Sequence, residues 1–244
     1  MSDRVEGLGR RFARFANDAV VARPGLWRLF RLPLRRYFDR LAPGWEGRRA
    51  DDRLLPLGMA LDRLDAAPAS ILDLGTGTGI AARVLAKRFP VARVIGADVS
   101  AKMVREAERL RPPELRDRLE FVVADAASLS FGDDEFDLVV LVNMIPFFDE
   151  LARITAPAGA VILAFSSGPS TPIYVPTETL RERLEPYDFV LEELEAGGGT
   201  AVLARRTSTA RGVGDGEGRD RTGDTTVFSR VLYQLSYLAA RVAV

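Results

Sequence analysis

Three glycines at alternating positions, placed directly after a short apolar run that contains an acid, constrain this chain more than any other feature. Residues 71–80 read ILDLGTGTGI, with the acid at Asp73 and the glycines at Gly75, Gly77 and Gly79. The apolar run predicts a buried strand, and a helical pattern begins after the last glycine. Glycine lets the backbone turn sharply and approach a ligand closely. We therefore predict a strand, a ligand-binding turn and a helix in succession.

Short apolar runs alternate with helical patterns from residue 68 to residue 206, which is typical of a parallel sheet with crossover helices. Seven strands within about 140 residues fit one doubly wound, Rossmann-like α/β domain. The last two runs flank three consecutive glycines and predict a closing hairpin. The expected strands lie at 70–74, 93–97, 119–124, 136–142, 160–165, 189–194 and 200–204.

The chain divides into three zones: a helical zone at 1–67, the sheet domain at 68–206 and a tail at 207–244. In the tail, 207–226 is rich in glycine and charge and has no aromatic residue, which predicts a flexible linker. An apolar helix is expected at 227–244. We interpret the tail as an annotation extension, added where a gene prediction continues beyond the true stop. The competing interpretation is a helix that binds a membrane surface or a partner.

The residue types that are missing exclude several chemistries. The chain contains no cysteine and no histidine, so disulfides, thiol nucleophiles and Ser-His-Asp arrangements are excluded, and we expect no metal site. Lys+Arg and Asp+Glu number 34 each, so no overall field attracts nucleic acid, and none is expected as a partner. The sequence has no apolar run of about 18 residues and no signal peptide, so we expect a cytoplasmic protein.

The first fifty residues hold twelve arginines against five acidic residues, and apolar residues are mixed with the arginines from 10 to 37. This pattern predicts amphipathic helices with their apolar side toward the protein and the arginines outside. Pro24, Pro33 and Pro43 are expected to separate these helices, and the last helix is expected at 51–65. One alternative is contact with an anionic membrane surface. Binding of RNA is a weaker alternative, because no RNA-binding module is recognisable.

Two ligand classes bind a glycine-rich turn of this kind, and the charge around the turn separates them. Residues 77–82 satisfy G-x-G-x-x-A, the pattern of NAD-binding sheets. A pyrophosphate, however, disfavours a carboxylate such as Asp73 beside the turn, whereas a cationic ligand favours it. Asp98 comes directly after the second expected strand, where a carboxylate can accept hydrogen bonds from ribose hydroxyls. Asp125 follows the third strand and can accept from an exocyclic amine, so the three acids fit a ligand with an ammonium, a ribose and an aminopurine.

That ligand is S-adenosylmethionine (SAM), and residues 69–206 resemble the class I SAM-dependent methyltransferases. The similarity points to the small-molecule branch that includes the quinone-biosynthesis methyltransferases. It implies the strand order 3-2-1-4-5-7-6 with the seventh strand antiparallel, and a helical lid formed by the N-terminal zone. The motifs that carry the resemblance are D-x-G-x-G-x-G from Asp73, D-V-S-x-x-M from Asp98, D-A from Asp125, FDLVV at 136–140 and ELARI-x-AP-x-G at 150–159.

The resemblance implies a role for each motif residue toward SAM. Asp73 and the turn at 75–79 hold the methionine end, Asp98 binds the ribose, and Val99 and Met103 pack on the adenine. A purely structural role is the alternative for each, because an acid after a strand can cap a helix and a methionine is more often part of the core.

Three further residues are implied beside the adenine and the methyl group. Asp125 and the amide of Ala126 read the adenine edge, and Asn143 lines the cofactor floor and faces the methyl group. The structural alternatives are a turn for Asp125 and hydrogen bonds to the backbone at a strand end for Asn143.

The segment after the fourth expected strand departs from the family pattern. Many relatives carry a histidine-rich segment there, whereas this chain reads NMIPFF at 143–148, and the helix that follows is expected to be short. Methyl transfer is an in-line displacement that needs a base only when the nucleophile must lose a proton. Tyr37, Asp39, Asp52 and Asp149 are candidates for a base, and the sequence selects none of them. An amine, a thiol, a carboxylate or a stabilised carbanion is favoured as acceptor over a hydroxyl that needs an imidazole.

The sequence therefore predicts a SAM-dependent methyltransferase that acts on a small molecule, with its oligomeric state undetermined. One alternative function is a SAM-binding protein without catalysis, because its cofactor motifs would be identical. Another is an NAD(P)-dependent oxidoreductase. That function does not explain Asp73, and no catalytic Tyr-x-x-x-Lys or histidine is recognisable.

Overall fold

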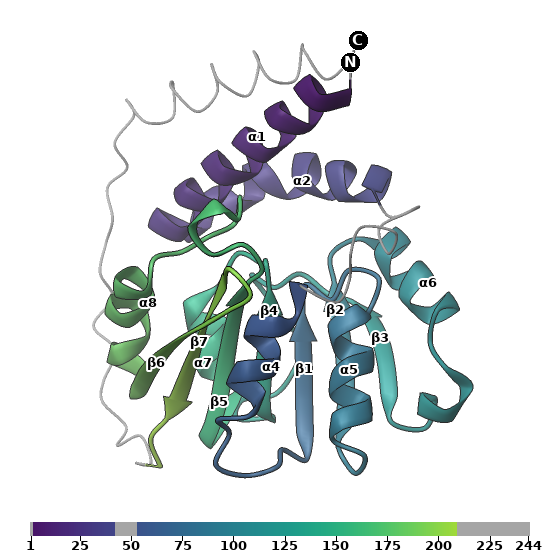
Figure 1. Cartoon of the computed structure of the whole chain (residues 1–244), viewed down its shortest axis with the longest axis vertical. Helices are drawn as coiled ribbons and strands as arrows, with labels where there is room; N and C mark the ends of the chain where they lie inside the picture. Colours follow the sequence, from purple (N-terminus) through teal and green to yellow (C-terminus); the bar gives the residue numbers. More distant parts are fainter. Residues whose placement is uncertain (1, 42–52, 209–244) are drawn as a thin grey trace. The chain divides into compact units, whose positions relative to one another are not determined.

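A computed structural model of the chain describes residues 2–41 and 53–208. Within this part, residues 13–208 belong to one compact unit built on a seven-stranded sheet (Figure 1). The strands are β1 (Ser70–Leu74), β2 (Arg93–Asp98), β3 (Leu119–Val123), β4 (Phe136–Val142), β5 (Thr155–Phe165), β6 (Phe189–Ala196) and β7 (Gly199–Arg206). Their order is β3-β2-β1-β4-β5-β7-β6, and β7 runs in the opposite direction to the other six strands, pairing antiparallel with β5 and β6. The predicted Rossmann-like α/β fold and strand order are confirmed.

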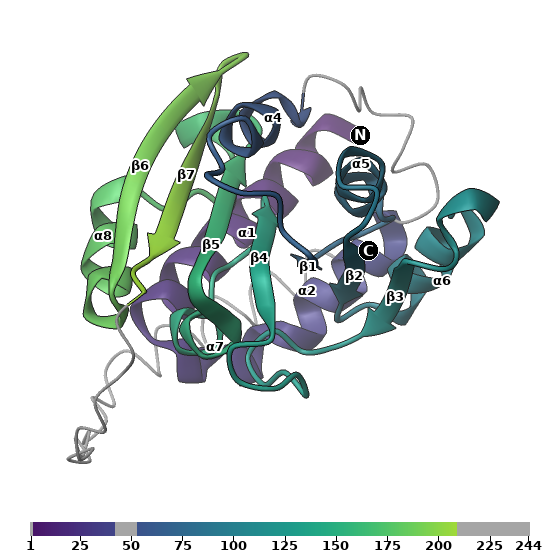
Figure 2. The ribbon, with the colours of Figure 1, turned by 90° about the horizontal axis from the view of Figure 1, so that it is seen from below.

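Helices cover both faces of this sheet, as expected for a doubly wound fold (Figure 2). The helices α4, α5 and α6 lie on one face and form one buried cluster with it, which includes Leu57, Leu85, Val104 and Leu138. The helices α7 and α8 lie on the other face. The helices are α1 (Ser2–Ala22), α2 (Trp27–Leu41), α4 (Leu55–Leu61), α5 (Ile80–Arg88), α6 (Ala101–Arg109), α7 (Phe148–Ile154) and α8 (Thr177–Leu184), with short 3-10 turns at Pro24–Leu26, Pro113–Leu115, Gly168–Ser170 and Glu185–Tyr187.

The fifth strand begins earlier than the sequence predicts. β5 starts at Thr155, directly after the short helix α7, and Thr155 pairs with Phe136 of β4. The register shifts after this pair, and Ala158 there has a φ of +61°, which marks a local bulge. The sequence Pro157-Ala158-Gly159 has the composition of a turn, so the apolar pattern indicates only the part of the strand that follows it.

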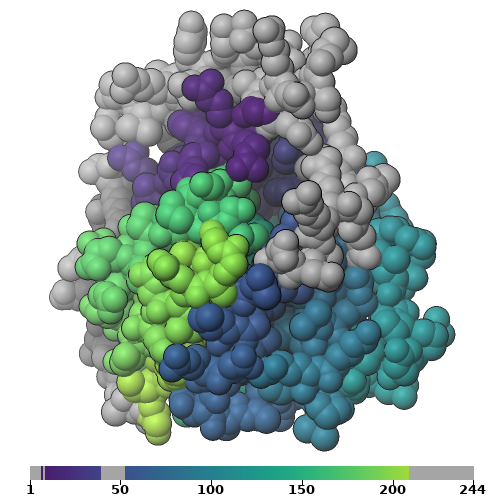
Figure 3. All heavy atoms as spheres, viewed as in Figure 1, coloured from purple at the N-terminus to yellow at the C-terminus, as the bar shows by residue number. Residues whose placement is uncertain are grey.

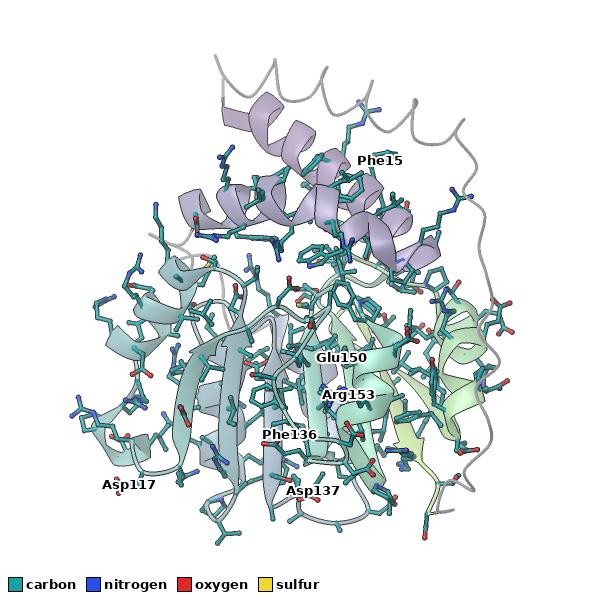
Figure 4. All side chains as sticks on the ribbon, turned by 180° about the vertical axis from the view of Figure 1, so that it is seen from behind. Phe15, Asp117, Phe136, Asp137, Glu150 and Arg153 are labelled. Carbon is teal, nitrogen blue, oxygen red and sulfur yellow. The ribbon has the colours of Figure 1, made fainter. Side chains whose placement is uncertain are left out.

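Proline has different effects at its two positions in the N-terminal helices. Pro24 begins the 3-10 turn between α1 and α2, as predicted, but Pro33 lies inside α2 and does not end it. We attribute the continuation to packing, because Phe30 and Leu34 on either side of Pro33 are buried. The ring of Phe15 on α1, which is labelled in Figure 4, meets the ring of Phe30 edge to face, with 5.8 Å between centroids.

The segment after β5 holds α1 through backbone carbonyls. Arg14 donates to the carbonyl oxygens of Pro169 and Thr171, both at 2.7 Å, and Asn17 Nδ2 donates to that of Tyr174 at 3.0 Å. Figure 3 shows the green atoms of this segment against the purple atoms of α1. These contacts connect the N-terminal helices to the end of the central strands.

Two predictions lie partly outside the described residues. The tail expected at 207–244 is described only as far as residue 208, two residues after the end of β7. The helix expected at 51–65 is described as the shorter α4, without residues 51 and 52. Among the described helices, none has the length and apolar character that crossing a membrane requires.

Candidate functional site

Three acids lie at one edge of the sheet, as the sequence predicts. Asp73 is the next-to-last residue of β1, Asp98 ends β2, and Asp125 follows β3 by two residues. Because these strands are parallel neighbours, their carboxyl ends meet at the same edge. Helix α2 passes over this edge in Figure 1 and contributes side chains to it.

The glycine-rich turn connects β1 to α5 with a backbone that other residues rarely adopt. Gly75, Gly77 and Gly79 have φ values of +75°, +56° and +83°. The amides of Gly75 and Thr76 both donate to the carbonyl oxygen of Ala97, at 2.8 and 3.0 Å, which holds the turn against β2. A Cβ at position 75 would overlap with the sulfur of Met144, so the flexible Met144 side chain would have to move, and the φ of +75° is the stronger reason for glycine there.

Asp73 is a buried carboxylate beside this turn. The residue is 1% exposed, and its Oδ2 accepts a hydrogen bond from the hydroxyl of Thr76 at 2.6 Å. Burial raises the pKa of Asp73 to about 6, although the hydrogen bonds from Thr76 and from the backbone at Ala82 act in the opposite direction. A buried carboxylate of this kind is stabilised by a cation that binds next to it.

Asp98 connects the turn to the start of α6. Its Oδ2 accepts from the amide of Gly77 at 3.0 Å, and its Oδ1 accepts from the amide of Ser100 at 2.8 Å. Burial raises the pKa of Asp98, the two amides lower it, and the charge of Asp39 raises it further. A carboxylate offers about four acceptor positions, so each oxygen retains one for a hydroxyl of a ligand.

Asp125 is bound by side chains of α2. Its Oδ1 accepts from Trp27 Nε1 at 2.7 Å and from the amide of Ala127 at 3.1 Å, and its Oδ2 accepts from Arg31 at 2.9 Å. Trp27 is buried, and its ring meets the ring of Phe147 edge to face at 5.4 Å between centroids. The N-terminal helices therefore reach the acid that the sequence assigns to the adenine edge.

The remaining residues that the sequence assigns to the cofactor lie near this edge of the sheet. Met103 and Ala126 are buried, and Val99 is half-buried next to Asp98. Asn143 has a φ of +52° and exchanges two hydrogen bonds with Ser166, at 2.7 and 2.9 Å, which join the ends of β4 and β5. The role of Asn143 toward a methyl group stays a prediction.

The four candidates for a base have different surroundings. Asp39 accepts a hydrogen bond from the hydroxyl of Ser100, and the ring of Tyr37 packs on Phe38 at 5.4 Å between centroids. Asp149 is exposed on α7 and accepts from the hydroxyl of Tyr187, and Asp52 lies outside the described residues. Over residues 2–41 and 53–208, no three acids, histidines or cysteines form a group that could hold a metal ion.

Sequence reasoning missed several residues that support the site. Ser100 belongs to the D-V-S-x-x-M motif, but its role was not assigned: it accepts from the amide of Met103 at 3.1 Å and caps α6, and a serine just before a helical pattern is the signal for such a cap. Thr76 donates its hydroxyl to Asp73, three residues earlier, and no sequence pattern indicates this hydrogen bond. Trp27 and Arg31 were part of a general amphipathic pattern, which does not indicate a single hydrogen-bond partner.

The comparisons with known proteins agree with this geometry. Residues 71–159 match a protein family described as a methyltransferase domain. The chain is 37% identical over 150 residues to a malonyl-[acyl-carrier protein] O-methyltransferase of Halorhodospira halophila, which covers 57% of this chain and 49% of that protein. It is also 37% identical over 151 residues to a demethylmenaquinone methyltransferase of Thermus thermophilus, which covers 54% and 66%. The matched region is a class I SAM-dependent methyltransferase domain.

A solved structure agrees with the fold of this methyltransferase domain. A SAM-dependent methyltransferase of Aquifex aeolicus superposes with a TM-score of 0.53 at 17% identity, over 64% of this chain and 93% of that chain. An identity this low shows a shared fold alone. The chain spans 49% and 66% of the length of the two curated relatives, so the methyltransferase domain is the part that they have in common with it.

Proposed function

We propose that the chain is a SAM-dependent methyltransferase that transfers a methyl group to a small-molecule acceptor. The observation that carries the proposal is the buried carboxylate of Asp73 beside the glycine-rich turn. The ammonium of SAM is a cation that stabilises this carboxylate, whereas the pyrophosphate of NAD(P) would be repelled by it. The NAD(P)-dependent oxidoreductase is therefore the weaker alternative.

We assign the other acids to the remaining parts of SAM. Asp98 has two acceptor positions left for the ribose hydroxyls, and Asp125 accepts from the amine of adenine. Val99 and Met103 supply apolar surface for the adenine ring, and the amide of Ala126 donates to its edge. These assignments use positions at the carboxyl ends of three adjacent strands.

When SAM is bound, it supplies a methyl group that its sulfonium already activates. The chain's own residues then orient the acceptor and exclude water. Aromatic pairs lie near the ends of β4 and β5: Trp27 with Phe147, and Phe165 with Tyr174 at 5.1 Å between centroids. They favour an apolar acceptor, which agrees with the quinone named for the relative from Thermus thermophilus.

We also propose the division of the chain that the sequence suggests, with residues 1–67 as a lid and 68–206 as the methyltransferase domain. The contacts of Trp27 and Arg31 with Asp125, and of Asp39 with Ser100, support a lid over the cofactor. A lid of this kind excludes water from the reacting groups.

Calorimetric titration of the full chain with S-adenosylhomocysteine and with NADH tests the cofactor. We expect S-adenosylhomocysteine to bind and D98A to weaken binding by at least about 30-fold, because two charge-assisted hydrogen bonds are lost. The matched control is D117A, which removes an exposed carboxylate from the loop before β3. Binding of NADH alone would overturn the proposal.

Turnover separates an enzyme from a SAM-binding protein without catalysis. We expect the chain to form S-adenosylhomocysteine when SAM is supplied with quinol, amine and thiol acceptors in turn. Tight SAM binding without product from any of them favours the non-catalytic alternative.

A second proposal concerns the exposed face of α2, which we infer to contact anionic membrane surfaces. Arg28 and Arg36 are exposed there together with Leu32, which is 50% exposed. Because Trp27 and Phe30 are buried, the contact is electrostatic and does not involve insertion of the apolar side.

Co-sedimentation with vesicles that contain phosphatidylglycerol measures this contact. We expect wild type to bind at low salt and not at high salt, and R28E/R36E to bind at neither, because each arginine near such a surface contributes about 1 kcal/mol. Binding that persists in R28E/R36E contradicts the role of this face.

A further inference from the structure

The two oxygens of Asp125 have partners of different character. Oδ1 is held by two donors, the buried indole of Trp27 and the amide of Ala127. Oδ2 has one side-chain partner, Arg31, whose side chain is 48% exposed. Oδ1 is therefore fixed by donors that belong to the folded structure, whereas the guanidinium of Arg31 on Oδ2 can be replaced by water.

Helix α2 contacts a second point at the same edge of the sheet. At its far end, Asp39 accepts a hydrogen bond from Ser100, which lies two residues after the strand that ends in Asp98. The helix thus contacts the ends of both β2 and β3. A ligand that binds along these strand ends meets α2 at the position of Arg31.

We propose that Arg31 is an exchangeable partner of Asp125: the amine of the cofactor's adenine takes its position on Oδ2, while Trp27 keeps the carboxylate oriented. The exchange rests on the proposed function, because it requires an adenosyl ligand. Trp27 is a positioning residue that acts through Asp125, and Arg31 sets the affinity for the cofactor.

The physical reason lies in the difference between the two donors. An ion pair with a solvent-exposed arginine contributes little, so its loss is nearly compensated by hydration of the guanidinium. The hydrogen bond from the buried indole to a charged acceptor is stronger, and nothing in the ligand replaces it. Of the two donors, Arg31 is therefore the one whose position the adenine amine can take, and Trp27 stays in place.

Calorimetry with S-adenosylhomocysteine and S-inosylhomocysteine tests the exchange, because inosine carries a carbonyl oxygen where adenine carries the amine. We expect R31M to bind S-adenosylhomocysteine about two- to fivefold more tightly than wild type, and R28M, the matched control on the same helix, to bind as wild type does. We also expect wild-type affinity to rise with salt, which screens the pair with Asp125, and R31M affinity to lack that dependence.

The variant W27F tests the positioning role, because it keeps an aromatic ring against Phe147 and removes the indole donor. We expect the preference for the adenosyl over the inosyl ligand to fall about tenfold in W27F. Thermal unfolding verifies that this variant folds, and R31M provides a test that does not depend on W27F.

The outcomes separate the exchange from the function on which it rests. Wild-type binding of S-adenosylhomocysteine with R31M equal to R28M, or weaker, overturns the exchange and leaves the proposed function in place. An unchanged adenosyl preference in folded W27F overturns the positioning role. A wild-type chain that binds neither nucleoside ligand overturns the proposed function and the exchange together.

Discussion

Replacing Asp73 by asparagine is expected to stabilise the protein without ligand and to abolish binding of SAM. The residue is almost completely buried, and burial raises its pKa from 3.8 to about 6. A shift of one unit corresponds to about 1.4 kcal/mol, so at neutral pH the ionised form lowers the free energy of unfolding by roughly 3 kcal/mol. Asparagine keeps the size of the aspartate side chain and an oxygen that accepts from Thr76. We therefore expect the free energy of unfolding of D73N to exceed that of wild type by about 1–3 kcal/mol at neutral pH.

The pH dependence follows from the direction of the shift. Since the pKa of Asp73 is higher in the folded chain than in the unfolded one, the folded chain binds more protons between about pH 4 and pH 6. The contribution of Asp73 to stability is therefore full below about pH 4 and is lost as the pH rises through 6. Urea unfolding of wild type and D73N across this range should give curves that diverge up to about pH 6 and then run parallel.

Ligand binding should change in the opposite direction. The ammonium of SAM interacts with the ionised carboxylate, so we expect wild-type affinity for S-adenosylhomocysteine to fall below about pH 6 and D73N affinity to be at least about 100-fold lower at neutral pH. Methylthioadenosine, which lacks the amino-acid part, should bind both proteins alike. A D73N variant that binds S-adenosylhomocysteine as wild type does would contradict the assignment of Asp73 to the ammonium.

The α/β class and most strand positions could be predicted from the sequence because their signals are local, whereas the strand order was implied by the resemblance to the methyltransferases. Each central strand is a short apolar run, and parallel neighbours bring Asp73, Asp98 and Asp125 to one edge regardless of how the helices pack. The start of β5 was missed for the same reason, since the bulge at Ala158 interrupts the local pattern.

The contacts of the site that depend on tertiary packing could not be predicted. Trp27 and Asp125 are 98 positions apart, and the amphipathic pattern of α2 indicates which side is buried but not which acid the indole meets. The same holds for Asn143 and Ser166, whose side chains meet only because β4 and β5 end side by side.

Replacing Gly79 by alanine should cost about 2–5 kcal/mol of the free energy of unfolding, from two separate causes. Its φ of +83° is a left-handed conformation, which costs a residue with a Cβ about 1–2 kcal/mol. The added Cβ would lie 2.5 Å from Cζ of Phe121 and 3.2 Å from the Cβ of Ala107, and overpacking of this kind costs about 1–3 kcal/mol.

Gly198 offers a control that isolates the backbone cost. Its φ is +78°, and a Cβ there would meet no heavy atom within 4 Å, so G198A should lose only about 1–2 kcal/mol. The difference between G79A and G198A then measures the overlap with Phe121, and F121L should recover most of that difference in a double-mutant cycle. Phe121 also restricts Gly96, where a Cβ would lie 2.5 Å from the same ring. If G79A and G198A lose the same free energy of unfolding, the Phe121 ring moves aside without cost, and glycine is required at position 79 only for the backbone conformation of the turn.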